Sequence, residues 1–170
     1  MNFEFATATR IIFGAGKLNQ IGDFARVLGR HPLIVTGRNL TRAQPLLALL
    51  DTSAKSFAAT AFPICGEPTL LDVQKGAAVA KAAGCDFVIA FGGGSAIDAG
   101  KAIAAMLTND GELLDYLEVI GRGRALTEPS APFIAIPTTA GAGAEVTRNA
   151  VLASPEQKFK VSLRSPLILP

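Results

Sequence analysis

An apolar segment that runs straight into three glycines constrains this chain more than any other feature. Phe87 to Phe91 is followed by Gly92-Gly93-Gly94-Ser95 and then by an Ala- and Ile-rich stretch that ends at Leu107. The apolar run predicts a strand buried on both faces, and the stretch after the glycines predicts a helix. Glycine tolerates positive φ and lets a ligand approach the backbone, and a helix N-terminus offers unpaired amides. This turn therefore predicts a phosphate-binding site.

The rest of the chain repeats the alternation of short apolar runs and Ala/Leu-rich stretches, with glycines between them. The pattern is typical of an α/β fold with a mostly parallel sheet and flanking helices, similar to a Rossmann domain. Helices are expected at 18–28, 43–50, 69–83 and 96–107, and strands at 3–5, 10–13, 33–36, 56–62, 86–91 and 133–136. Residues 146–153 and 159–163 are expected to pair as two further strands.

Two familiar phosphate motifs do not fit the glycine turn. Ile97 stands where the dinucleotide fingerprint needs its third glycine, and Ala102 follows Gly100-Lys101 where a P-loop needs Ser or Thr. Ser95 is expected to cap the helix together with Asp98, and Lys101 to pair with Asp98. A tight, capped turn without a ligand remains the alternative, but three consecutive glycines cost folding entropy and favour phosphate binding.

A second segment of small and hydroxyl residues follows the apolar run at 133–136. It contains Thr138, Thr139, Gly141 and Gly143, and we call it the threonine segment. In an open α/β sheet, ligands bind at the carboxyl ends of the strands, where this segment is expected to lie. The two threonines could hydrogen-bond a ribose or a base; a flexible loop explains the composition equally well.

Composition excludes several functions. A net charge of +2 without a long basic run gives no case for nucleic acid, and no apolar stretch reaches the roughly 20 unbroken residues of a membrane span. With one histidine and two cysteines, the chain cannot build an ordinary His/Cys metal site. The N-terminal residues do not form a secretory signal, so a cytoplasmic protein is expected.

Together the two segments resemble the paired signatures of the iron-containing (group III) alcohol dehydrogenases. The resemblance rests on Gly92-Gly93-Gly94-Ser95-x-x-Asp98-x-x-Lys101 and on Ile136-Pro137-Thr138-Thr139-Ala140-Gly141-x-Gly143-x-Glu145-Val146-Thr147. Phe13-Gly14-Ala15-Gly16, Gly66-Glu67-Pro68-Thr69 and Lys158-Phe159-Lys160 are also similar to that family. The resemblance implies that residues 1–170 form the dinucleotide-binding domain, with 150–170 beginning the connection to an absent all-helical domain.

The resemblance also implies roles for individual residues. Gly93, Gly94 and Ser95 would hold the diphosphate of NAD(P), and Gly92 in the same turn is also assigned to cofactor binding. The remaining contacts are assigned to Thr138 and Thr139 at the adenosine, Val151 at the nicotinamide and Lys160 at the nicotinamide ribose. Asp98 and Lys101 are interpreted as structural residues that touch no substrate.

Three departures from the family pattern bear on the cofactor. Gly37 stands where many members carry an Asp that repels a 2′-phosphate, and Arg38 follows it, so NADP should be accepted at least as well as NAD. Ala142 and Ala144 replace the family's usual Thr and Ser. One lost hydrogen bond would weaken cofactor binding by roughly 0.5–1.5 kcal/mol.

The implied function is hydride transfer between NAD(P) and a small alcohol or aldehyde. The family's Fe²⁺ or Zn²⁺ would come only from the absent C-terminal domain, so this chain alone is expected to be inactive. Two alternatives remain, a freestanding nucleotide-binding module without redox activity and a relative of dehydroquinate synthase. A homodimer through the N-terminal strands is a further possibility, which sedimentation equilibrium can test.

Overall fold

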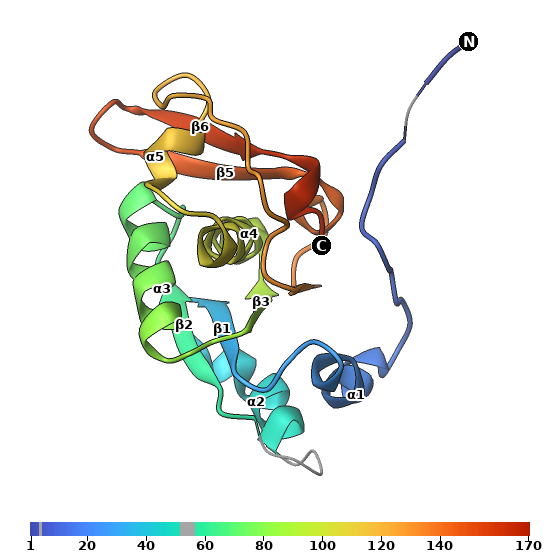
Figure 1. The fold of residues 1–170 in the computed structure, drawn as a ribbon. Helices are drawn as coiled ribbons and strands as arrows, with labels where there is room; N and C mark the ends of the chain where they lie inside the picture. The colour runs from blue at the N-terminus through green and yellow to red at the C-terminus, as the bar shows by residue number, and fades with distance from the viewer. Residues whose placement is uncertain (4, 52–56) are drawn as a thin grey trace.

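The computed structural model describes residues 1–3, 5–51 and 57–170 and contains a four-stranded parallel sheet. The strands run in the order β2-β1-β3-β4 (Figure 1). Their bounds are Pro32–Gly37 for β1, Thr60–Ile64 for β2, Phe87–Gly92 for β3 and Phe133–Pro137 for β4. The two central strands are buried because helices cover both faces, which accounts for their continuous apolar runs. The α/β fold with a mostly parallel sheet is thus confirmed.

Each face of the sheet has its own apolar core. On one face, Ile34 and Ile89 pack with residues of α1 and α2. On the other, Val35 and Val88 belong to a larger core shared with α3, α4 and a C-terminal hairpin. The elements of the first face are η1 Lys17–Gln20, α1 Ile21–Arg26, η2 Leu40–Ala43 and α2 Gln44–Asp51; those of the second are α3 Leu70–Ala82, α4 Gly94–Thr108 and α5 Leu113–Tyr116.

The C-terminal hairpin lies over α4, on the side away from the sheet (Figure 1). It consists of β5 (Asn149–Ser154) and β6 (Phe159–Arg164), which pair antiparallel as a sheet of their own. The short helices η3 (Ala144–Val146) and η4 (Pro166–Ile168) flank it. Helix α4 is therefore enclosed between two sheets, and ten of its fifteen residues are buried.

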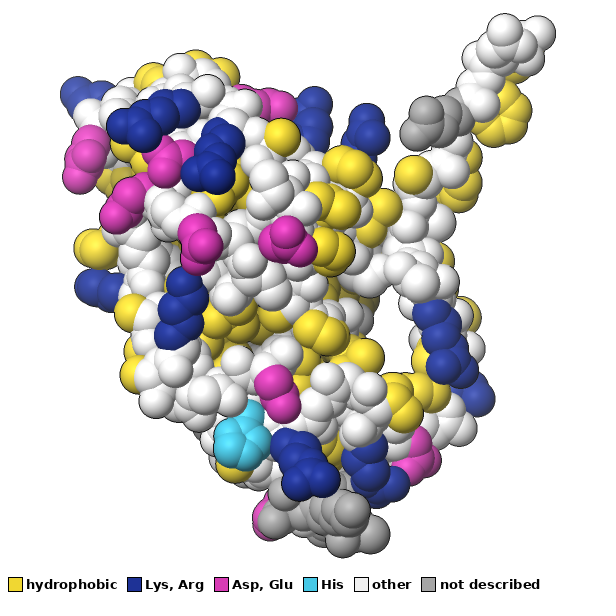
Figure 2. Space-filling view, in the orientation of Figure 1, with side chains coloured by type: hydrophobic (Ala, Val, Ile, Leu, Met, Phe, Trp, Pro, Cys, Tyr) yellow, Lys and Arg dark blue, Asp and Glu magenta, His cyan; other side chains and the backbone are white. Residues whose placement is uncertain are grey.

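The opening strands and the start of β2 need correction. The opening strands are wrong, because the described residues among 3–5 and 10–13 form no strand. Phe3 and Phe13 are 84% and 95% exposed. The N-terminal end of the chain projects from the body (Figure 2), and farther along the same segment the N–H of Thr9 donates to the Pro170 carbonyl at 2.9 Å. In the described part of the chain the residues of the expected opening strands pair with no strand, and the homodimer through them stays a prediction. The strand expected at 56–62 is β2, which begins at Thr60, the first residue that pairs with β1. Ser56 lies outside the described residues.

The remaining expected elements are confirmed within a few residues. Thr69 caps α3 in a capping box with Asp72, as its position before the helix suggests. The hairpin begins at Asn149 rather than at Val146, because residues 144–146 form a turn of 3₁₀ helix. In the described part of the chain, no helix combines the length and the apolar character needed to cross a bilayer.

Two glycines let β3 and α4 approach each other. A methyl group on Gly92 would lie 2.7 Å from Ala96 Cβ, and one on Gly100 would lie 2.9 Å from both Ala90 Cβ and Phe133 Cε2. Both distances are below normal carbon–carbon contact. These glycines therefore set how closely the helix packs on the strand that carries the glycine turn.

We expect Gly100→Ala to destabilise the fold by roughly 1–2 kcal/mol, because overpacking outweighs the better helix propensity of alanine. The free energy of unfolding in urea measures the change. Gly37→Ala is the control, since its added methyl group meets no atom within 4 Å. Equal stability of the two variants would contradict the packing argument.

Candidate functional site

The two predicted segments meet at the carboxyl edge of the parallel sheet. The backbone N–H of Thr138 donates to the Gly92 carbonyl at 2.8 Å. A methyl group on Gly93 would lie 3.3 Å from Thr139 Oγ1, and one on Gly92 would lie 3.5 Å from the amide nitrogen of Gly37. Strand β1 sits between β2 and β3, so this edge includes the point where strand order reverses, the usual place for a ligand in such sheets.

The N-terminus of α4 opens at this edge. Gly93, not Ser95, is the N-cap, and its carbonyl accepts from the amides of Ala96 and Ile97 at 3.1 and 3.2 Å. Among the described residues, the amides of Gly94 and Ser95 have no hydrogen-bond partner. Both amides are therefore available to an acceptor outside the chain.

The structure corrects two details of the glycine turn. None of the three glycines has positive φ. Their small size serves close packing instead: a methyl group on Gly94 would lie 3.1 Å from Ala142 Cβ. The expected cap pair of Ser95 and Asp98 is also absent, because Asp98 points toward Lys101, with 3.5 Å between Lys101 Nζ and Asp98 Oδ1.

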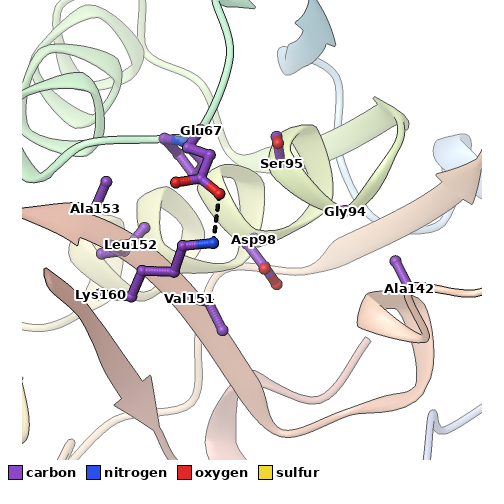
Figure 3. Close-up of a pocket in the computed structure, with 10 residues that line it drawn as sticks. Glu67, Gly94, Ser95, Asp98, Ala142, Val151, Leu152, Ala153 and Lys160 are labelled. Atoms are coloured by element: carbon purple, nitrogen blue, oxygen red, sulfur yellow. Dashed lines mark hydrogen bonds and ion pairs between the residues drawn. The ribbon is translucent and has the colours of Figure 1, made fainter.

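Beside the helix N-terminus lies an open cavity of about 300 Å³, lined by residues of α4, the hairpin and the turn before α3 (Figure 3). Four predicted residues line it, namely Gly94, Ser95, Val151 and Lys160. The other six predicted residues do not; Gly37, Arg38, Gly92, Gly93, Thr138 and Thr139 lie along or just beyond the adjoining strand ends.

Six further residues line the cavity that are not among the predicted cofactor contacts, namely Glu67, Pro68, Asp98, Ala142, Leu152 and Ala153. Of these, Ala142 enters the prediction only through a lost hydrogen bond, and Asp98, predicted to be structural, also faces the cavity. In the sequence, Glu67 stands out only as part of the turn before α3. Its place in the cavity follows from its ion pair with Lys160, 93 positions away along the chain, which only the structure shows.

That ion pair joins two walls of the cavity. Glu67 and Lys160 point toward each other from the turn before α3 and from β6 (Figure 3). The backbone N–H of Ala153 donates to the Pro68 carbonyl at 2.8 Å, so the same turn is also attached to β5. The position of Glu67 is therefore fixed by the backbone of the hairpin.

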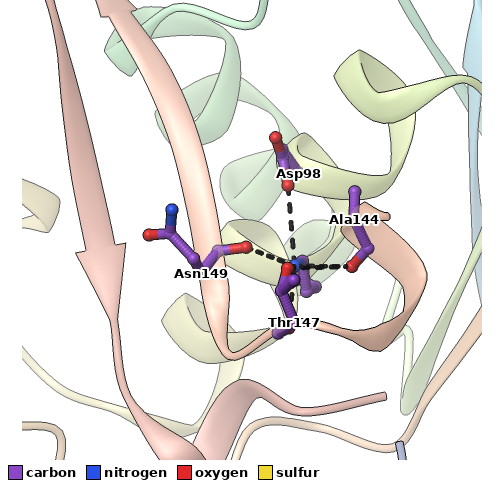
Figure 4. A network of polar contacts seen from close by, with 5 residues as sticks. Asp98, Ala144, Thr147 and Asn149 are labelled. Carbon is purple, nitrogen blue, oxygen red and sulfur yellow. Dashed lines mark hydrogen bonds and ion pairs between the residues drawn. The ribbon is translucent and has the colours of Figure 1, made fainter. Parts of the chain in front are cut away.

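A buried lysine on α4 holds the chain that leads into β5. Lys101, only 1% exposed, places its Nζ within 2.8 Å of the Ala144 carbonyl and 3.1 Å of the Thr147 carbonyl. It also donates to the Asn149 carbonyl and lies 3.3 Å from Thr147 Oγ1 (Figure 4). One ammonium on α4 thus donates to three backbone carbonyls in the chain between the threonine segment and the start of β5.

Burial shifts the titration of this cluster. Burial lowers the pKa of Lys101, although the charges of Asp98 and Glu145 oppose the shift. Burial likewise raises the pKa of Asp98, while the Lys101 charge and a hydrogen bond from the Val151 backbone oppose that shift. In residues 1–3, 5–51 and 57–170, no three His, Cys, Asp or Glu side chains are grouped to hold a metal ion.

We expect Lys101→Met to destabilise the fold by about 3 kcal/mol, because it leaves buried carbonyls without a donor and Asp98 without its cation. The pKa of Asp98 should rise further. A raised pKa means that the folded state binds this proton more tightly than the unfolded chain does. Protonation of Asp98 therefore stabilises the fold at low pH, and this contribution is lost as pH rises through the folded pKa. The variant should move this loss to higher pH. Denaturation and a carbon-13 NMR titration of the carboxyl measure both effects.

Lys81→Met is the matched control, because Lys81 is exposed near the end of α3. It should change the free energy of unfolding by less than about 0.5 kcal/mol. If the two Met variants behave alike, the ammonium of Lys101 does not hold the threonine segment.

Comparison with known proteins gives the site a family context. The family model described as iron-containing alcohol dehydrogenase matches residues 8–170. The 4-hydroxybutyrate dehydrogenase of Cupriavidus necator is 36% identical over 148 residues, which is 87% of this chain and 38% of that relative.

Solved structures agree. The sulfoacetaldehyde reductase of Bifidobacterium kashiwanohense, in complex with NAD⁺, superposes with a TM-score of 0.87 at 32% identity, over 100% of this chain and 45% of that one. A 1,3-propanediol oxidoreductase superposes with a TM-score of 0.90 at 30% identity, over 100% and 44%. The chain thus spans less than half the length of these relatives. By the extent of the family match and the agreement of the fold, it belongs to the iron-containing alcohol dehydrogenase family.

Proposed function

We propose that this chain binds NAD(P) and forms the cofactor-binding part of an enzyme that transfers hydride between the cofactor and a small alcohol or aldehyde. The observation that carries the proposal is the cavity at the carboxyl edge of the sheet, beside two amides of α4 that have no partner among the described residues. A diphosphate fits that chemistry, because amides at a helix N-terminus bind anions. The relative solved with NAD⁺ also supports the choice of ligand.

The residues present fit the cofactor as follows. The amides of Gly94 and Ser95 would hold the diphosphate, with Gly92 and Gly93 leaving room for it at the strand end. Thr138 and Thr139 offer hydroxyls beside the turn. Gly37 and Arg38 would lie at the adenine ribose, because Gly37 ends β1, the strand beside β3, and Arg38 follows it.

The other half of the cofactor would occupy the cavity. Val151 offers an apolar surface for the nicotinamide, and Lys160 would donate to the neighbouring ribose. When bound, the nicotinamide supplies the hydride acceptor or donor. The chain's own residues bind and orient it. The Fe²⁺ or Zn²⁺ that the family's chemistry implies does not fit the described residues, which offer no grouped ligands. We assign it to a part of the protein outside this chain.

NADH titration, followed by cofactor fluorescence and by NMR of the labelled chain, tests the proposal. Saturable binding that shifts the amide signals of Gly94 and Ser95 is the expected result. Binding that leaves both signals unmoved would refute the diphosphate site at Gly94 and Ser95, and no binding of NADH and NADPH would refute the dinucleotide assignment.

The proposal extends to cofactor choice. Gly37 is exposed, and no carboxylate in the described part of the chain pairs with Arg38. A 2′-phosphate would therefore meet the guanidinium of Arg38, whose charge no paired carboxylate neutralises. We therefore infer that NADPH binds at least as tightly as NADH.

We expect Gly37→Asp to weaken NADPH binding roughly tenfold relative to NADH, through repulsion of the 2′-phosphate. A side chain fits, because a Cβ on Gly37 meets no atom within 4 Å. Dissociation constants for both cofactors measure the effect, and Gly37→Ala adds the same carbon without the charge. A strong NADH preference of the unmodified chain, or equal behaviour of the two variants, would contradict the charge argument.

A further inference from the structure

Two side chains of opposite charge face the cavity as a pair. Glu67 and Lys160 are 59% and 60% exposed at their side chains and form an ion pair across the opening. The third charged lining residue, Asp98, has its own cation behind it in Lys101. The charge that the cavity presents to a ligand is therefore close to neutral, and removing either Glu67 or Lys160 alone would leave it charged.

The pair sits on the hairpin side of the cavity. Lys160 is the register partner of Ala153, and Val151 lies two residues along β5 on the same face. Glu67 is held to that strand by the hydrogen bond from the Ala153 amide to the Pro68 carbonyl. Both charges are thus fixed on the side of the cavity formed by Val151.

The redox state of a nicotinamide changes its charge. The oxidised ring carries a positive charge that the reduced ring lacks. An ammonium beside the ring disfavours the oxidised form, and a carboxylate favours it. A neutral pair does neither.

We propose that Glu67 is a specificity-determining residue that sets the relative affinity for oxidised and reduced cofactor by neutralising Lys160. The inference rests on the proposed function, which puts the nicotinamide beside Val151 and Lys160. Because both side chains are more than half exposed, solvent screens their field. At about 6 Å in a water-like dielectric, one unit charge changes an equilibrium constant roughly threefold.

The test compares dissociation constants for NAD⁺ and NADH at low salt in three variants. Glu67→Gln leaves Lys160 without its counter-charge, so it should shift the affinity ratio roughly threefold toward NADH. Lys160→Met leaves Glu67 alone and should shift the ratio by a similar factor toward NAD⁺. The double variant should return the ratio to that of the unmodified chain. High salt should shrink both shifts.

Glu118→Gln is the matched control. Glu118 pairs with Arg164, also on β6, at 3.8 Å, and the two side chains are 48% and 53% exposed. The substitution makes the same charge change outside the cavity and should leave the ratio unchanged. A ratio that moves equally in Glu67→Gln and Glu118→Gln, or single variants that shift it in the same direction, would overturn the inference.

The two proposals fail differently. If the unmodified chain binds neither NAD⁺ nor NADH, the proposed function falls and this inference falls with it. If it binds both and Glu67→Gln leaves the ratio unchanged, only the role of Glu67 is wrong. Because the readout is a ratio, a variant that weakens binding of both forms equally through local distortion also counts against it.

Discussion

The buried ammonium of Lys101 is the interaction on which the site depends. It sits on α4, between the parallel sheet and the C-terminal hairpin, and its acceptors are the carbonyls that lead from the threonine segment into β5. Without a cation there, those carbonyls would be buried without donors, at a cost that the loop could avoid only by moving. The glycine turn, the threonine segment and the hairpin thus keep their relative positions through one side chain of the enclosed helix.

Much of the fold could be predicted because the decisive signals are local. Phe87 to Phe91 and Leu33 to Thr36 are apolar runs bounded by glycine, and each forms a buried parallel strand. Thr69 with Asp72 is a capping signal that needs no tertiary contact. The glycine turn and the threonine segment could be expected to meet because both follow parallel strands, whose carboxyl ends share an edge.

What could not be predicted depends on distant partners. Phe3 and Phe13 are typical of strands, but a strand also depends on cross-strand pairing and packing, and both side chains are exposed without a strand partner among the described residues. Ser95 is a good capping residue, yet Gly93 takes that position because the helix starts earlier than the first apolar residue suggests. The approach of Glu67 to Lys160 depends on how the hairpin docks on the turn before α3, which no local pattern specifies.

The close approach of Gly94 to Ala142 has a consequence for divergence among related sequences. A methyl group on Gly94 would lie 3.1 Å from Ala142 Cβ, so the two positions share a single small volume. A larger side chain at either position is tolerated only when the side chain at the other position is small or the backbone shifts to make room. Side-chain sizes at these two sites, far apart along the chain, should therefore be inversely correlated, and this steric covariation would persist even in descendants that have lost the ligand.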